Sequence, residues 1–107
     1  MGPDTDVIII LTTFPVAGDA EAFASQLIAE RLAACVSILP IRSVYRWQGA
    51  IESSDERQLL IKTTTGRLSD LEIRIKALHP YDLPEFLVFP VIAGSRDYLS
   101  WLAESTA

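Results

Sequence analysis

The chain has 107 residues; half of them are hydrophobic, 21% are charged, and the net charge is -5 at pH 7. This length suits one domain with a real core, and the hydrophobic content excludes an intrinsically disordered chain. The acidic balance and the scattered arginines give no basic stripe that could follow phosphates. We therefore expect no nucleic-acid partner.

The single cysteine and the first residues bear on the compartment. Cys35 alone excludes an internal disulfide framework and fits a reducing environment. Residues 1–6 are acidic where a signal peptide would be basic, and the apolar run 7–11 is too short to span a membrane. We expect a cytoplasmic protein without a membrane partner, with a flexible tail over residues 1–6 and one domain over residues 7–107.

The first half of the chain predicts two strands that flank a helix, and a returning strand. The β-branched run 7–13 indicates a strand that ends at Pro15, and Asp19 is a typical N-cap for the helical pattern that follows it. Residues 36–48 indicate a long strand that is interrupted at Pro40. Gly49 predicts a tight turn, and the partner strand then returns to about residue 64.

The second half predicts two more helices around a fourth strand. A helical spacing of leucines and isoleucine runs from Leu68 to Leu78, residues 86–91 are an apolar strand, and Ser95 is placed to cap a last helix. The order is strand, helix, strand, strand, helix, strand, helix. It predicts an α+β fold, a ferredoxin-like βαββαβ sandwich with a long central hairpin and an extra C-terminal helix.

Two features of this fold do not suit a monomer. Its helices cover only one face of the sheet, yet residues 8–10, 59–61 and 86–89 are apolar on both sides of their strands. The central hairpin, which carries Tyr45 and Trp47, runs well past the ~5–6 residues of an ordinary strand and would expose its edges. Both features predict an obligate oligomer.

The turn over residues 79–85 is the strongest candidate site. Pro80 ends the preceding helical pattern just after His79, which is the only histidine, and Pro84 makes a second rigid corner. Such a turn can fix an imidazole, a phenol and two carboxylates for metal binding or for acid–base chemistry. The alternative is a structural corner, in which a histidine at a helix C-terminus is favoured by the helix dipole.

Five stretches in order carry a resemblance to a known family: residues 31–36, 43–52, 60–64, 79–85 and 97–102. On these stretches the chain resembles the CutA family, the divalent-cation tolerance proteins, over nearly its whole length. The resemblance implies a ferredoxin-like subunit in a compact trimer whose long hairpins pair between subunits. It also implies a role in tolerance of copper and other divalent metals. Some members carry a further cysteine in the first strand, where this chain has Thr12.

The candidate metal ligands are His79, Cys35, Glu85 and Asp82. Thiolate and imidazole together suit copper, so copper is the first candidate among the divalent cations. One chain supplies one cysteine and one histidine, and a complete site therefore has to be shared between subunits or be a weak surface site. The competing reading of Cys35 is a small buried hydrophobic residue, because free cysteine is often buried and inert.

A second group of residues is a candidate for an intersubunit surface or a ligand cleft: Tyr45, Trp47, Lys62, Tyr81 and Trp101. Aromatic residues on an overhanging hairpin are more typical of an interface than of a pocket, which favours the interface for Tyr45 and Trp47. Lys62 lies in an apolar strand, where lysine is seldom left unpaired. It could reach Glu85, a carboxylate of another subunit, or an anion held between subunits.

Motifs for catalysis are missing from the sequence. The glycines are scattered rather than grouped in a phosphate loop, and there is no nucleophile elbow and no zinc-type pairing of cysteine and histidine. We expect a cytoplasmic homotrimer that binds divalent metal, copper first, in cation tolerance, without catalysis or an obligatory cofactor. The alternative is a small-molecule-sensing trimer similar to the nitrogen-regulatory proteins, with its effector between subunits.

Overall fold

The structure is a computed structural model that describes residues 5–107. Its elements follow the predicted order. They are β1 (Val7–Pro15), α1 (Ala20–Ala29), β2 (Cys35–Trp47), β3 (Ala50–Thr64), a 3-10 turn (Thr65–Arg67), α2 (Leu68–Leu78), β4 (Leu87–Pro90) and α3 (Arg96–Ser105).

Three of the predicted helix ends are confirmed, at the start of α1, the start of α3 and the end of α2. Asp19 caps α1, because its Oδ1 accepts from the Ala22 N–H at 2.9 Å. Ser95 caps α3 in the same way, through the Tyr98 N–H. His79 ends α2 with an extended backbone (φ -74°, ψ 134°), as the following proline requires.

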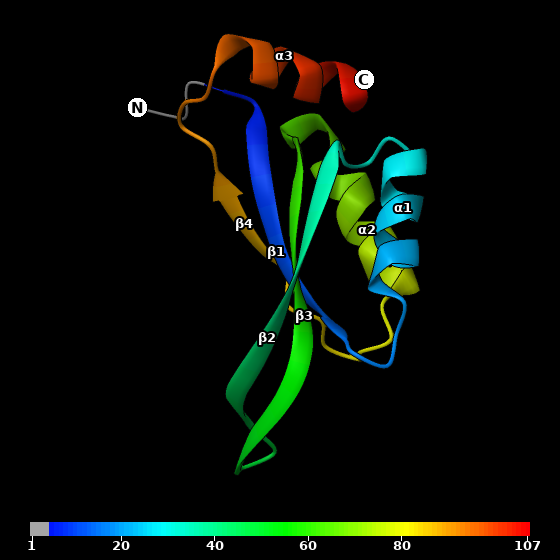
Figure 1. The fold of residues 1–107 in the computed structure, drawn as a ribbon, viewed down its shortest axis with the longest axis vertical. Coiled ribbons are helices and arrows are strands. Elements are labelled where there is room, and N and C mark those ends of the chain that lie inside the picture. The colour runs from blue at the N-terminus through cyan, green and yellow to red at the C-terminus, as the bar shows by residue number, and fades with distance from the viewer. Residues whose placement is uncertain (1–4) are drawn as a thin grey trace.

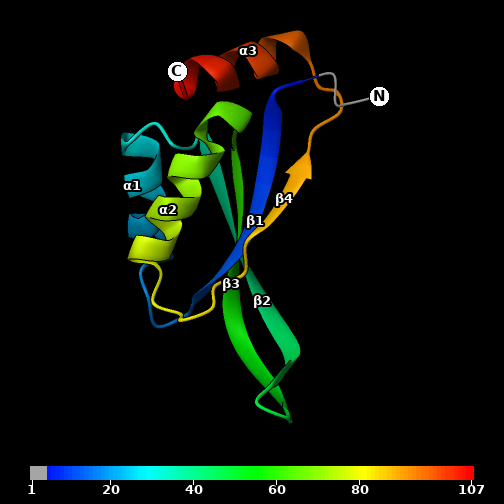
Figure 2. The same ribbon diagram turned by 180° about the vertical axis from the view of Figure 1, so that it is seen from behind.

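The four strands form one antiparallel sheet in the order β2-β3-β1-β4. Helices α1 and α2 lie side by side on one face, and α3 crosses one end of the sheet (Figures 1 and 2). The main core lies between the sheet and the first two helices. Its largest fully buried members are Ile10, Leu27, Leu59, Ile61, Leu71 and Ile75.

The second face of the sheet is apolar and largely uncovered. Side chains alternate along a strand, so the register places one set of paired residues on the face away from α1 and α2. We call this set the open face: Ile9, Leu11, Cys35, Ser37, Leu60, Lys62, Leu87 and Phe89. Leu87 and Phe89 are 50% and 48% exposed. Helix α3 covers only the end of this face, where Leu102 packs with Val7 and Ala34.

The hairpin of β2 and β3 extends far beyond the rest of the sheet. Strand β1 ends where Pro15 pairs with Glu56, whereas β2 and β3 stay paired to Trp47 and Ala50. We call residues 42–55 the arm, and Figure 1 shows it projecting from the end of the sheet opposite α3. Its turn has positive φ at Gln48 (50°) and Gly49 (82°), as a two-residue hairpin turn requires.

Three details of the predicted elements differ in the structure. Strand β2 runs through Pro40 without a break, because β2 is an edge strand and the missing N–H of proline can face away from β3. Strand β4 is shorter than predicted, at Leu87–Pro90. Of the predicted tail, residues 1–4 lie outside the described residues, and Thr5 donates a hydrogen bond to the Val91 carbonyl at 2.6 Å.

Candidate functional site

The imidazole of His79 is packed against the core at the C-terminal end of α2, where the turn begins. It is 8% exposed and lies among three aromatic rings. The ring centroids of Phe14, Phe23 and Tyr81 are 5.3, 6.1 and 4.9 Å away. The histidine therefore joins β1, α1 and the turn in one aromatic cluster.

Both ring nitrogens of His79 are already hydrogen-bonded. The Tyr81 backbone N–H donates to Nδ1 at 3.1 Å, so Nδ1 is an acceptor. Nε2 then carries the proton and donates to the carbonyl oxygen of Thr13. This neutral tautomer ties the turn to β1, and a metal could bind Nδ1 only by displacing the Tyr81 N–H.

The phenol of Tyr81 reaches a buried carboxylate on β3. Its hydroxyl donates to Glu56 Oε2 at 2.9 Å, and Glu56 is only 7% exposed. Burial, followed by the hydrogen bond to Glu56 and its negative charge, raises the pKa of Tyr81 to about 12. The phenol is thus held in its protonated, donating form.

The two carboxylates of the turn differ in their surroundings. Asp82 is exposed, whereas Glu85 is half-buried and accepts from Gln58 Nε2 at 3.3 Å. The same amide nitrogen donates to the Thr12 carbonyl at 2.7 Å, so Gln58 ties this end of the turn to β1. Asp82 and Glu85 therefore offer oxygen atoms at the surface beside the histidine corner.

Cys35 and Lys62 lie away from this corner. They face each other across β2 and β3 on the open face, level with Ile9, whereas the corner is joined to β1 at Thr13. Within residues 5–107, no three His, Cys, Asp or Glu side chains are grouped as a metal site would need. The four candidate ligands thus do not meet in one chain, and Cys35 is half-buried rather than in the core.

The predicted cleft residues are spread over three places. Tyr45 and Trp47 lie on the arm, and Trp47 is 46% exposed. Trp101 stacks on Tyr98 of α3 with ring centroids 5.4 Å apart, and Tyr81 belongs to the histidine corner. Lys62 approaches the hydroxyl of Tyr98 at 3.5 Å and does not reach Glu85.

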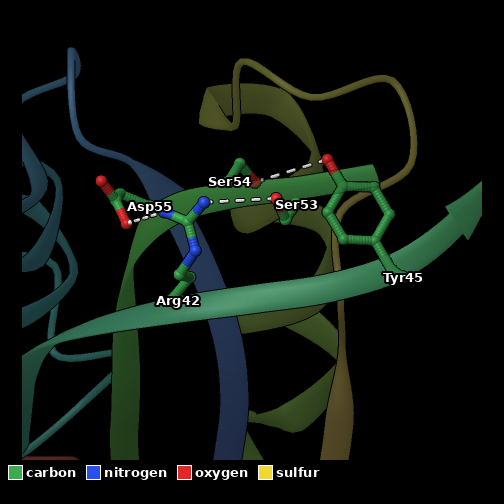
Figure 3. A network of polar contacts seen from close by, with 5 residues as sticks. All are labelled: Arg42, Tyr45, Ser53, Ser54 and Asp55. Carbon is green, nitrogen blue, oxygen red and sulfur yellow. Dashed lines mark hydrogen bonds and ion pairs between the residues drawn. The ribbon is translucent and has the colours of Figure 1, made fainter. Parts of the chain in front are cut away.

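Polar contacts across the arm hold its two strands together (Figure 3). Arg42 of β2 contacts Asp55 at 2.9 Å and Ser53 at 3.3 Å, both on β3. The hydroxyl of Tyr45 lies 3.4 Å from that of Ser54. These exposed contacts do not cover the apolar side chains of the arm.

Sequence reasoning missed Glu56 and Gln58 as partners of the turn. Both lie on the side of β3 that carries Leu60, and the sequence predicts that this side is buried. They are therefore polar residues at positions predicted to be buried. That signal was available, because a buried carboxylate has to find a donor. What the sequence could not supply was the identity of the donor, Tyr81, which lies 25 positions further on.

Comparison with known proteins identifies the family. Residues 8–105 match the sequence model of the family described as "CutA1 divalent ion tolerance protein". The chain is 48% identical to the divalent-cation tolerance protein CutA of Thermus thermophilus over 99 residues, which cover 92% of this chain and 96% of that one. The chain belongs to the CutA family. Its relatives are named tolerance proteins and not enzymes.

Solved CutA structures have the same fold. The structure of CutA from Synechococcus elongatus matches with a TM-score of 0.93 at 43% identity, covering 98% of this chain and 94% of that one. A CutA from Archaeoglobus fulgidus that is described as periplasmic matches with a TM-score of 0.91 at 33% identity, covering 94% and 99%. In the part of this chain that is described, no helix has the length and apolar character to cross a membrane.

Thr12 is the position at which the resemblance places a cysteine in some CutA proteins. It is 0% exposed, and among the described residues its hydroxyl has no hydrogen-bond partner. Thr63, on the neighbouring strand and also 0% exposed, donates to the Leu32 carbonyl at 2.7 Å. The two threonines are equally buried, and they differ in that, within the described chain, only the Thr63 hydroxyl forms a hydrogen bond.

We expect Thr12→Val to leave the free energy of unfolding unchanged or to raise it by up to about 1 kcal/mol, because it removes an unpaired buried hydroxyl. Thr63→Val should lower it by about 1 kcal/mol, because the Leu32 carbonyl loses its donor. Urea denaturation at one protein concentration measures both. A loss in Thr12→Val as large as that in Thr63→Val would mean that the Thr12 hydroxyl has a partner.

Proposed function

We propose that this CutA protein acts in the cytoplasm as a homotrimer of ferredoxin-like subunits in divalent-cation tolerance, binding copper or another divalent cation without catalysis. The match to the CutA family over residues 8–105 is the observation that carries the role in tolerance. The relatives are named for tolerance of divalent cations, and the strand order β2-β3-β1-β4 supports a ferredoxin-like subunit.

The open face and the arm support the assembly. A single chain leaves Leu87 and Phe89 half exposed on a sheet face that α3 covers only at one end. The arm adds Tyr45 and Trp47, which no part of the same sheet can cover. Apolar surface of this kind, together with free strand edges, is what an obligate interface buries.

We expect only trimer in solution. Sedimentation equilibrium at low micromolar concentration should give three times the subunit mass of 11.8 kDa. An interface that covers the open face and the arm should bury more than ~2,000 Å² in total, which keeps subunits associated at this concentration. A stable folded monomer would contradict the proposed assembly.

The carboxylates of Asp82 and Glu85 at the surface beside the turn support a metal site, and the imidazole of His79 would add a nitrogen only where a metal displaces the Tyr81 N–H from Nδ1. Mixed nitrogen and oxygen donors suit a divalent cation such as copper. One chain does not complete the site, because the described residues hold no cluster of three such donors. The remaining donors would come from a neighbouring subunit, and Cys35, on the open face, would stay outside the site.

Copper binding should then depend on the turn and not on Cys35. We expect calorimetric titration to show at least a tenfold weaker copper affinity for the double variant Asp82→Asn/Glu85→Gln, because two oxygen ligands lose their charge. Cys35→Ser should bind copper like the unaltered protein. A matched control is Asp97→Asn/Glu104→Gln on α3, which removes two exposed carboxylates away from the turn. Unchanged copper binding in Asp82→Asn/Glu85→Gln would contradict the site.

A further inference from the structure

Lys62, the cation of the open face, has no anionic partner among residues 5–107. The ammonium group of Lys62 lies 3.5 Å from the hydroxyl of Tyr98 and 5.7 Å from the centroid of its ring. Across the strands its neighbours are Cys35 and Ile9, and Ile9 in turn pairs with Phe89. Among residues 5–107, Lys62 forms no ion pair.

Covering the open face would bury the ammonium group of Lys62, and this costs free energy unless the covering surface supplies a hydrogen-bond acceptor. The side chain is half-buried beside apolar residues, and Tyr98 of α3 lies against its ammonium group. Further burial without a counter-ion would disfavour the ammonium form strongly. Whatever covers the open face should therefore bring a carboxylate to Lys62.

The inner face of the arm has the matching composition. Along β3 the even-numbered residues share the face of Lys62, and they include Glu52, which pairs across the arm with Tyr45. Trp47 lies on the same face as Tyr45. The arm thus presents two aromatic side chains and a carboxylate on the side that would meet an apolar face with one ammonium group.

Glu52 is the carboxylate on the inner face of the arm that is still free to pair with an ammonium group. Glu56 already accepts from Tyr81, and Glu85 accepts from Gln58. Glu52 is exposed and forms no ion pair within the described chain. Glu52 and Lys62 are ten residues apart on one strand, about 33 Å, so they can pair only between chains.

We propose that the arm of one copy lies on the open face of a second copy, where Glu52 pairs with Lys62 of the partner subunit. The aromatic side chains of the arm cover the apolar residues of that face, and the ion pair fixes the register of the arm. The inference rests on the proposed assembly and names the contact that orients it. The ion pair is partly desolvated, so removing one partner leaves an uncompensated charge in the interface.

The test is a double-mutant cycle on assembly, with Lys62→Met and Glu52→Gln. Sedimentation of each protein in a urea series gives the dissociation constant of the assembly. We expect each single variant to raise the dissociation constant about tenfold or more. The double variant should raise it no further, because the two substitutions remove the same interaction. Lys76→Met, which breaks an exposed pair with Glu72 on α2, is the matched control and should change it little.

Several outcomes would overturn the inference. A tighter assembly in Lys62→Met would mean that Lys62 has no carboxylate partner, and additive single effects would mean that Glu52 is not that partner. A small anion that native mass spectrometry finds on the unaltered protein and not on Lys62→Met would assign the ammonium to a ligand. Glu52→Gln lies on the exposed arm and should fold normally, so it remains informative if Lys62→Met does not fold.

The same measurements separate this inference from the proposed assembly. If the unaltered protein sediments as a monomer, the assembly and the Glu52–Lys62 contact fail together. If it sediments as a trimer whose dissociation is unchanged by both single variants, only the contact fails. A charge swap supports the contact directly, because Lys62→Glu combined with Glu52→Lys should restore assembly that each single reversal weakens.

Discussion

Replacing His79 by alanine should lower the free energy of unfolding by about 3 kcal/mol, the largest single effect that we expect in this protein. The substitution removes a ring that packs against Phe14, Phe23 and Tyr81. It also leaves the Thr13 carbonyl and the Tyr81 N–H without their partners. Urea denaturation at a fixed protein concentration measures the change, because assembly makes stability depend on concentration.

His79→Phe separates the packing from the hydrogen bonds. Phenylalanine keeps a ring in the aromatic cluster but satisfies neither backbone group, so we expect a smaller loss of about 1–2 kcal/mol. Ile73→Ala is the matched control, since Ile73 lies on α2 and is largely exposed. Its effect should stay within about 0.5 kcal/mol. If His79→Ala unfolds at the same urea concentration as the unaltered protein, the imidazole is not a structural corner and is free to serve a ligand.

Much of the fold could be predicted from the sequence, because it depends on local signals. Pro80 predicted the end of α2, and the extended backbone at His79 follows from the steric clash with the proline ring. Asp19 and Ser95 were predicted as caps and act as caps. One exception is Pro40, where the edge position of β2, a tertiary feature, removed the need for the N–H that proline lacks.

The candidate site could be predicted only in part, since its contacts join distant segments. The sequence placed His79, Tyr81, Asp82 and Glu85 in one turn, but it could not show that both imidazole nitrogens would be used by backbone groups. Nor could it separate Cys35 from the turn. The sheet register does so, because it sets Cys35 beside Lys62 at the opposite end of the open face.

Tyr81→Phe should lower the free energy of unfolding by about 2 kcal/mol near pH 8.5, because the buried carboxylate of Glu56 loses its hydrogen-bond donor. The effect should depend on pH in a defined window. Burial raises the pKa of the Tyr81 phenol to about 12, above its ordinary value of 10.0. Below pH 10 the phenol is protonated in both the folded and the unfolded chain, so its stabilising contribution is fully present.

Between pH 10 and pH 12 the unfolded chain releases the phenolic proton while the folded chain retains it, so the contribution of Tyr81 to stability falls as the pH rises. The stability difference between the unaltered protein and Tyr81→Phe should therefore shrink across this window. Urea denaturation of both proteins from pH 8.5 to pH 12 measures this difference in the free energy of unfolding. Groups that titrate alike in the two proteins cancel in the difference. Tyr98→Phe is the control, because the Tyr98 hydroxyl, on α3, approaches Lys62 and is not among the groups that raise the pKa of Tyr81. A constant difference between pH 8.5 and pH 12 would show that the Tyr81 phenol is not held in its protonated form by Glu56 and burial.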